Sequence, residues 1–501
     1  MAKEKRKKRR REDCDDDEEE DDREQRQRTD DEAKGAELDG EEEESADERD
    51  GAYGSDDSED EDEQFFVACS EGNLAEIEAM HEAGAANPDA IEPEEGDVPL
   101  GVACRFGHLE VAKWLMAHGA NLEAANKAGE TALHDACLHG SMPTIEWLLT
   151  QPGAEALLAR QTDQGITPLA LAALGGHTEA VRALIARGAS LTTVDAEGHD
   201  LMHMACSNGH QAAAAALREL GVPTNARDAS GRTPLHLACG EGHLEVVTWL
   251  RDVGGASIDE ADDGGTLALH FACAAGDGPT ARWLLDSGAS VSVPNAEGNT
   301  PLHYTCQAGS TDMAEALLAK GADASAVNTD GDTPFLLGCF GGHLALCKML
   351  HGRGQDVEQT NALGSSALLQ ACAGGHLEVA QWLLPLAPAL LERGDFEGDG
   401  PLVHCCAYGH KEVAEWLLAE GAKPSEAAYK VSKPHPSTYK LIKRALKHGT
   451  SGASGASSSS SATPGVGASS ASGAGGQPEK TSGSADPSSG KARAFGPASS
   501  T

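Results

Sequence analysis

Residues 228 to 250 of this 501-residue chain read DASGRTPLHLACGEGHLEVVTWL, and this stretch predicts two short helices separated by a glycine. Thr233 is a suitable N-cap because its hydroxyl can accept a backbone N–H, and Pro234 suits the first helical position, where no donor is needed. His236 can reach back to the cap, as Glu or Gln does in a capping box. Gly242 can end the helix in a left-handed conformation, and the apolar spacing after it marks a second helix. The stretch therefore predicts a helix hairpin.

The same pattern recurs along the chain at a nearly constant spacing. Ten glycines, called the repeat glycines below, stand 33 to 36 residues apart: Gly107, Gly140, Gly176, Gly209, Gly242, Gly276, Gly309, Gly342, Gly375 and Gly409. A unit of this length cannot bury its apolar face alone and must stack on its neighbours. The Asp-x-x-Gly lead-in predicts a tight turn between units. The predicted fold class is all-α, an array of stacked helix hairpins with β-turn fingers.

These units resemble the ankyrin repeat. The resemblance rests on the Thr-Pro-Leu-His lead, the Gly-His between the helices and the Leu-Leu followed by Gly-Ala, which recur in residues 163–189 and 295–323. Ten good copies run from Asp97 to Ala422, and a degenerate copy from Gln64 to Ala86 has the character of a capping repeat. The resemblance implies an ankyrin solenoid of about eleven repeats over residues 64–422.

Two departures from the pattern predict loops. The step between Gly140 and Gly176 is 36 residues long and carries three extra residues around Gln151 to Ala154. Prolines interrupt the pattern after Leu384, at Pro385 and Pro388. Insertions in repeat proteins fall in loops, often on one face of the array. Both loops are therefore candidates for contacts with a specific partner.

The two ends differ in composition from the array. Residues 1–63 hold 13 Lys and Arg against 31 Asp and Glu, which predicts a disordered charged arm, basic from Lys3 to Arg11 and acidic afterwards. Residues 423–449 predict one basic amphipathic helix, beginning after Pro436, that caps the last repeat. Residues 450–501 are rich in Ser, Gly and Ala and predict a disordered tail, in which Phe495 is the single aromatic residue.

The basic cluster is typical of a nuclear-import signal, and the acidic run can attract basic proteins such as histones or ribosomal proteins. Alternatively, both are solvated segments that keep the chain soluble. No apolar stretch approaches the ~20 residues that span a bilayer, and the amino end is charged. We therefore expect a soluble protein of the cytoplasm, the nucleus or both.

Thirteen cysteines and a recurring His-x-x-Cys spacing raise the question of a metal or redox site. Ten of them stand three residues before a glycine of the repeat pattern, where ankyrin repeats usually have a small buried Ala, so we expect core packing instead. Equivalent atoms of neighbouring repeats would lie roughly 10 Å apart, too far for a disulfide or a tetrahedral metal site.

Twelve of the twenty histidines and all six tryptophans also occupy repeated positions, which favours scaffold roles. The chain has no nucleotide-binding, hydrolase or kinase motif. We therefore expect no catalytic residue, no metal and no cofactor.

The resemblance implies a non-enzymatic scaffold or adaptor that binds proteins through the concave face and turn tips of the array. The tips are mostly acidic, which favours basic or polar partners, and we expect a monomer with no direct contact to nucleic acid or membrane. The candidate partner-binding residues are Glu197, His199, Ser230, Arg232, Asp263, Glu297, Asn299, Asp330 and Asp332. The alternative is a nuclear acidic chaperone or regulator, in which the acidic arm binds basic proteins and the repeats only locate it.

Overall fold

A computed structural model describes residues 57–449. Most of the predicted arm, with its basic cluster, and the predicted tail at residues 450–501 lie outside the described residues. Between residues 57 and 449 the secondary structure consists of helices and turns, together with three isolated β-bridges. No helix in this range is both long and apolar enough to cross a membrane. The prediction of an all-α array is confirmed.

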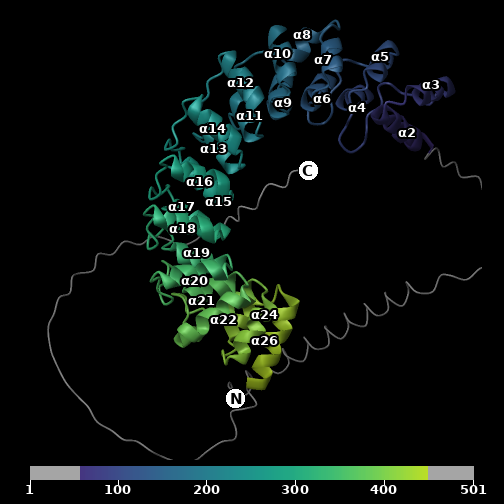
Figure 1. The fold of residues 1–501 in the computed structure, drawn as a ribbon. Helices are drawn as coiled ribbons and strands as arrows, with labels where there is room; N and C mark the ends of the chain where they lie inside the picture. The colour runs from purple at the N-terminus through teal and green to yellow at the C-terminus, as the bar shows by residue number, and fades with distance from the viewer. Residues whose placement is uncertain (1–56, 450–501) are drawn as a thin grey trace, which may run out of the picture. The chain divides into compact units, whose positions relative to one another are not determined.

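The chain divides into two compact units, at residues 1–296 and 297–501, and each is a stack of helix pairs. Figure 1 shows the pairing, for example of α11 with α12. The pairs of the first unit are α2 (Asp57–Glu71) with α3 (Leu74–Ala83), α4 (Pro99–Arg105) with α5 (Leu109–Ala117), α6 (Ala132–His139) with α7 (Met142–Leu148), α9 (Pro168–Leu174) with α10 (Thr178–Ala186), α11 (Leu201–Ser207) with α12 (Gln211–Glu219), α13 (Pro234–Gly240) with α14 (Leu244–Asp252), and α15 (Ala268–Ala274) with α16 (Gly278–Asp286). One extra helix, α8 (Ala154–Leu158), follows α7.

The second unit continues the same arrangement. Its pairs are α17 (Pro301–Ala308) with α18 (Thr311–Ala319), α19 (Pro334–Phe340) with α20 (Leu344–Gly352), α21 (Ala367–Ala373) with α22 (Leu377–Leu386), α23 (Pro401–Ala407) with α24 (Lys411–Ala419), and α25 (Glu426–Val431) with α26 (Pro436–Gly449). A 3₁₀ turn, η1 (Pro388–Leu391), follows α22. Both predicted insertions thus form a short helical turn.

Small buried residues let the first helices of successive pairs pack closely. Within the first unit α4 packs on α6, and α11 packs on α13. The buried faces of these helices hold residues such as Ala136 and Cys137 on α6 and Ala205 and Cys206 on α11. All the cysteines among residues 57–449 are buried, including those at the repeat position, for which burial was predicted. Burial raises the pKa of the Cys69 thiol to about 12, so this thiol behaves as a small apolar group.

The structure corrects two predicted boundaries. Helix α2 begins at Asp57, inside the segment that was expected to be a disordered arm, and its buried residues include Phe65. Residues 423–449 form two helices rather than one, because Ser425 caps an additional helix by accepting the N–H of Ala428 at 3.1 Å. The basic helix α26 therefore belongs to a hairpin that repeats the pattern of the array.

The predicted capping boxes are confirmed. The backbone N–H of Thr233 donates to Nδ1 of His236 at 2.9 Å, so that Nδ1 is an acceptor and the ring proton is assigned to Nε2. Nε2 in turn donates to the carbonyl of Glu260 in the next lead-in, at 2.9 Å. His134 makes the same two contacts, with the N–H of Thr131 and the carbonyl of Ile166. His303 makes them with the N–H of Thr300 and the carbonyl of Asp332. Each ring has to be neutral to accept a bond at Nδ1.

A second set of histidines joins many of the hairpins to the hairpin before them. Apart from His435, which follows Pro434, these residues follow a glycine of the repeat pattern. Each donates Nε2–H to a carbonyl near the end of the first helix of the preceding pair. His177 bonds to the carbonyl of Leu138 at 2.9 Å, His343 to Gln307 at 2.9 Å, and His435 to Ala407 at 2.9 Å. The ring lies directly over the left-handed glycine of the preceding repeat, such as Gly309 beneath His343. The glycine is therefore required both for its backbone conformation and for the space it leaves.

We predict that Gly309→Ala destabilises the second unit by about 2 kcal/mol or more, because alanine is strained at positive φ and the ring of His343 would have to leave its carbonyl partner. The control is Gly352→Ala at the end of α20, where an added Cβ meets no atom within 4 Å. The measurement is urea unfolding of the full-length chain. Equal stabilities of the two variants would contradict the prediction.

We also predict that stability falls as the pH drops below about 6.5, the ordinary pKa of histidine. Burial lowers the pKa of His134, His236 and His303, so the unfolded chain binds more protons than the folded chain. The stability that each buried neutral histidine contributes is complete above pH 6.5 and is lost as the pH falls toward the lower pKa of the folded state. The loss in unfolding free energy reaches up to about 1 kcal/mol per histidine at pH 5.5.

The matched variant for this prediction is His236→Gln, which can still form a capping box but does not titrate. Its loss of unfolding free energy between pH 7.5 and pH 5.5 should be smaller than that of the unsubstituted chain by up to about 1 kcal/mol. His81→Gln, at an exposed position of α3, serves as the control. An unchanged pH dependence in His236→Gln would show that this ring does not carry the effect.

Candidate functional site

The fingers from residue 195 to residue 399 are built around a first residue that is Asp or Asn, whereas the finger at residues 162–166 begins with Thr162. Each has five residues, as in Asp195 to His199, with the glycine fourth. Oδ1 of Asp195 accepts the N–H groups of Glu197 at 3.0 Å and His199 at 2.7 Å. Oδ1 of Asn328 likewise accepts those of Asp330 at 3.1 Å and Asp332 at 2.8 Å. The first side chain therefore holds the turn and is not available to a partner.

Backbone hydrogen bonds also connect neighbouring fingers. In each link the N–H of the second residue donates to the carbonyl of the third residue of the preceding finger. In the first unit the links include Ala196 to Gln164 at 3.0 Å, Ala229 to Glu197 at 3.0 Å, and Asp263 to Ser230 at 3.1 Å. In the second unit they are Thr329 to Glu297 at 2.8 Å, Ala362 to Asp330 at 2.9 Å, and Phe396 to Leu363 at 3.0 Å. Within each unit, the third-position side chains therefore form a row with a fixed backbone spacing.

The nine predicted partner-binding residues fall into two groups. The residues in the second and third positions are exposed: Glu197, Ser230, Asp263, Glu297 and Asp330. The fifth-position residues are half-buried or buried: His199, Arg232, Asn299 and Asp332. The first group presents side chains outward, and the second group makes contacts between fingers.

Asp332 was expected at a free tip, and this part of the expectation is wrong. Its exposed fraction is 9%, and its Oδ1 accepts a hydrogen bond from Asn361 of the next finger at 2.8 Å. Burial raises the pKa of this carboxyl group, and the hydrogen bond from Asn361 lowers it by a smaller amount. Asn299 has a similar position, because its Oδ1 accepts a bond from Asn328 at 3.0 Å. The fifth position therefore joins fingers, for reasons that a single repeat does not show.

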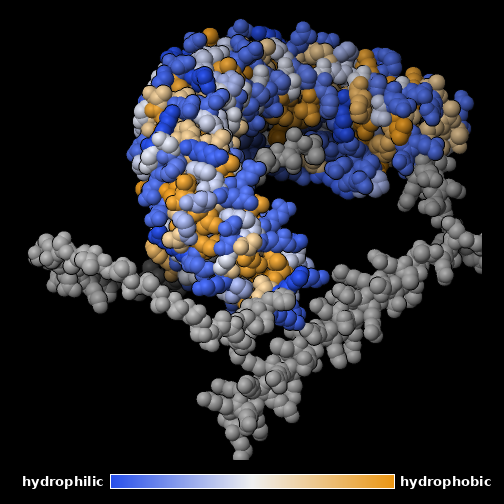
Figure 2. Space-filling model, turned by 60° about the horizontal axis from the view of Figure 1, so that its bottom comes forward, coloured by the Kyte–Doolittle hydropathy of each residue, from blue (hydrophilic) through white to orange (hydrophobic). Residues whose placement is uncertain are grey.

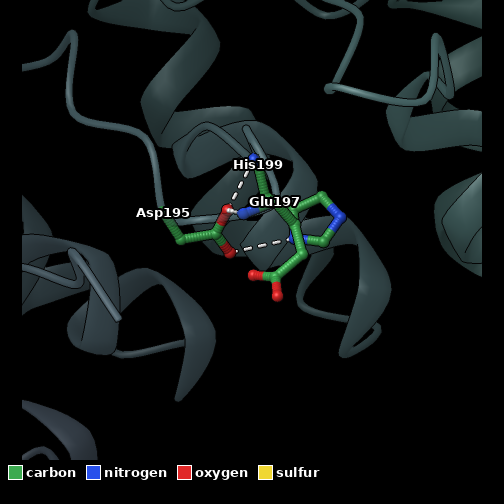
Figure 3. A group of neighbouring side chains, drawn as sticks. All are labelled: Asp195, Glu197 and His199. Atoms are coloured by element: carbon green, nitrogen blue, oxygen red, sulfur yellow. Dashed lines mark hydrogen bonds and ion pairs between the residues drawn. The ribbon is translucent and has the colours of Figure 1, made fainter. Parts of the chain in front are cut away.

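Asp195, Glu197 and His199 each bring one possible metal-ligand atom within 4.8 Å of the others (Figure 3). However, the existing bonds already use both ring nitrogens of His199. Nδ1 lies 2.9 Å from Oδ2 of Asp195, and Arg232 donates to Nε2 at 3.0 Å. A guanidinium at this distance opposes a second cation.

We interpret the group as a link between two fingers. His199 Nε2 lies 3.3 Å from Oδ2 of Asp228, which also binds Nε of Arg232 at 2.7 Å. The chain Asp195, His199, Arg232 and Asp228 thus joins successive fingers through polar contacts. In Figure 3 the carboxylate of Glu197 takes no part in the drawn bonds. That no metal binds to this chain stays a prediction.

Two exposed apolar tip residues escaped the sequence reasoning. Leu363 is the third residue of its finger and Phe396 the second residue of the next finger, and their exposed fractions are 67% and 79%. Their backbones are bonded to one another at 3.0 Å, so the two side chains belong to adjacent links of the same row. Figure 2 shows such apolar residues interspersed among hydrophilic ones on the drawn face. Aligning the fingers by their glycines would have revealed both residues.

The two predicted insertions each line a cavity. In the first unit, α8 and the loop before it border a cavity of about 320 Å³ with Leu149 and Arg187. In the second unit, the end of α22, η1 and α24 border a cavity of about 480 Å³ with Leu384, Trp416 and Glu420. Whether either loop contacts a partner stays a prediction.

The chain is similar to known proteins that contain ankyrin repeats. A family model described as ankyrin repeats (3 copies) matches residues 65–159, 153–228, 220–295, 269–361 and 335–427. The mouse protein fem-1 homolog A-like is 35% identical over 95 residues, which are 19% of this chain and 14% of that protein. The rice probable E3 ubiquitin-protein ligase XBOS32 is 29% identical over 170 residues, 27% of this chain and 34% of the relative.

The Saccharomyces cerevisiae probable 26S proteasome regulatory subunit p28 is 33% identical over 136 residues, 27% of this chain and 58% of that protein. The chain therefore covers less than two thirds of each of these relatives. What they share with it is the repeat segment, and the family match extends along nearly all the helix pairs of the described residues. The chain belongs to the ankyrin-repeat family.

Proposed function

We propose that this chain is a non-enzymatic scaffold or adaptor that binds partner proteins through the rows of finger tips on its two units. Ankyrin repeats typically mediate protein binding. The observation that carries the proposal is the set of exposed third-position side chains, Glu197, Ser230, Glu297 and Asp330, on a backbone that is hydrogen-bonded from finger to finger. A preformed surface of this kind loses little conformational entropy on binding, so that contacts over several repeats can add to the affinity.

The charge of the tips favours a basic or polar partner surface. Glu197, Glu297 and Asp330 are exposed acids in the row. Asp263 is partly balanced, because Arg227 donates to its Oδ1 at 3.0 Å. Complementary charge accelerates association and excludes like-charged partners more than it adds affinity. The acids therefore select the class of partner, and apolar tip residues supply anchoring area.

Three observations support the remaining parts of the proposal. The Asp and His side chains of the fingers are engaged with one another, which suits a structural role better than a catalytic one. Relatives whose names denote functions as different as a ubiquitin ligase and a proteasome regulatory subunit match the chain only in part, as expected of a shared binding module. The cysteines of residues 57–449 are buried and form no disulfide, which suits a reducing compartment, so we propose that the protein acts in the cytoplasm, the nucleus or both.

The first test reverses charge in the tip row. Partners purified with the full-length chain are produced individually, and their affinity is measured for the triple variant Glu197→Arg, Glu297→Arg and Asp330→Arg. We expect at least a roughly tenfold loss, since truncation of a few central interface residues commonly costs more than 1 kcal/mol each. The control triple variant, Glu179→Arg, Glu245→Arg and Glu412→Arg, reverses exposed acids on second helices.

A parallel measurement uses the chain without residues 1–56. Partner binding that survives this deletion and fails in the tip variant supports the proposal. Binding that fails on deletion and survives in the tip variant would instead assign the function to the acidic arm, as in the alternative of a nuclear acidic chaperone or regulator.

The second test concerns Phe396. We predict that Phe396→Ser leaves the urea midpoint nearly unchanged, because this side chain is 79% exposed and surface substitutions usually change stability by less than about 0.5 kcal/mol. The same variant should weaken the binding of partners that contact the second unit by about tenfold, as loss of an aromatic anchor does. Ala362→Ser, at the equivalent position of the preceding finger, is the control. A stable variant with unchanged affinity for every partner would remove Phe396 from the proposed surface.

A further inference from the structure

The cavity beside η1 results from a specific departure from the repeat. Second helices normally end at a glycine with positive φ, as α24 does before Gly421 (φ 98°). In α22, Pro385 occupies the last turn, and the helix ends at Ala387 with φ −144°. Pro388 then begins the extra turn η1, which ends at Leu391. The chain therefore leaves its usual path and borders an open cavity of about 480 Å³ against α24.

The lining of this cavity is apolar with an acidic rim. Leu384, Pro385, Pro388, Leu391 and the half-buried Trp416 supply the apolar part, and Gln381 and the exposed Glu420 supply the polar part. Aromatic side chains beside proline and leucine are typical of sites that receive an aromatic or proline-containing segment. The acid favours a segment that also carries positive charge.

The cavity in the first unit provides a comparison. Leu149 is equivalent in the repeat to Leu384, since each stands nine residues after a repeat glycine. Arg187 is likewise equivalent to Glu420, since each stands eleven residues after one. The charged residue at the equivalent position of that cavity is the cation Arg187, which donates a hydrogen bond to the carbonyl of Leu149 at 2.7 Å. The position of Trp416 is held by Ala183. Only the cavity of the second unit thus combines an aromatic wall with an acidic rim at these positions.

We propose that residues 491–497 of this chain bind in the cavity of the second unit. This segment reads KARAFGP and contains Phe495, the single aromatic residue of the chain after α26. Phe495 lies against Trp416, Leu384 and Leu391, and Lys491 or Arg493 pairs with Glu420. The segment has two cations and no acid, so its charge complements the rim.

The length and starting point of the connecting chain support an intramolecular contact. The tail follows α26, and α26 packs against α24, the helix that carries Trp416 and ends directly before Glu420. Between Gly449 and Phe495 the chain is rich in Gly, Ser and Ala. For a Gly- and Ser-rich composition, a segment of this length corresponds to a root-mean-square span of roughly 35 to 40 Å, well beyond the ~14 Å length of α24. The effective concentration of the segment at the cavity is then on the order of millimolar.

A bound tail would make the insertion a regulated surface. A partner that offers a similar cationic and aromatic segment would have to displace residues 491–497 first. The inference does not depend on the finger tips, because the cavity is bordered by second helices and η1. It can therefore fail while the proposed scaffold function stands.

The test uses a fluorescein-labelled peptide of residues 488–501 and full-length protein. Anisotropy titrations compare the unsubstituted chain with Phe495→Ala, whose tail can no longer fill the cavity. We expect the peptide to bind Phe495→Ala and to bind the unsubstituted chain at least about tenfold more weakly, because the chain's own tail competes. A peptide carrying Phe495→Ala should not bind either protein.

Two further variants in the Phe495→Ala background locate the site. Glu420→Lys should weaken peptide binding about tenfold, whereas Glu412→Lys, an exposed position on the same helix outside the cavity lining, should not. Leu391→Ser removes apolar contact without a charge change and should also weaken binding. Circular dichroism melts confirm that each variant is folded. The proposal is overturned by absence of peptide binding to Phe495→Ala, by equal binding to both chains, or by equal effects of Glu420→Lys and Glu412→Lys.

Discussion

The array depends on neutral imidazole groups that bond many of its repeats to the next. One set accepts a cap N–H at Nδ1 and donates Nε2–H to the following lead-in, as His236 does with Thr233 and Glu260. The other set, such as His343, covers the glycine of the preceding repeat and donates to a carbonyl near the end of the first helix of that repeat. A helix of seven or eight residues leaves most of its terminal backbone groups without intrahelical partners. The histidines supply partners for some of these groups, and in doing so they set the distance between neighbouring hairpins.

The fingers divide structural and binding roles by position. The first residue closes the turn, the fifth contacts the neighbouring finger, and the third points outward between them. Asp332 and Asp330 illustrate the difference, since one accepts a bond from Asn361 and the other is exposed only two residues away. Because the structural positions carry the stability, the third position is free to vary in charge and size. Leu363 and Glu197 show how far it varies within one chain.

The sequence was sufficient for features that depend on residues close together in the chain. Caps, helix ends and the buried cysteine position follow from contacts over three or four residues, and all of them are present. The sequence was insufficient for contacts between repeats, which join residues about thirty positions apart. The role of Asn299 depends on Asn328, and no feature of one finger reveals it. Helix α25 was missed because it lacks the Thr-Pro-Leu-His lead, and its Ser425 cap is a weaker signal than a repeated motif.

The bonds of the two histidine sets and the fingers join adjacent repeats, and this has a mechanical consequence. Pulling on one end of a unit loads one interface at a time, because no described bond of these sets reaches past the next hairpin. Such a stack yields in small steps, each about one hairpin long, and re-forms in the reverse order when the load is removed. The same local links that define the repeat thus give each unit the properties of an extensible and reversible spring.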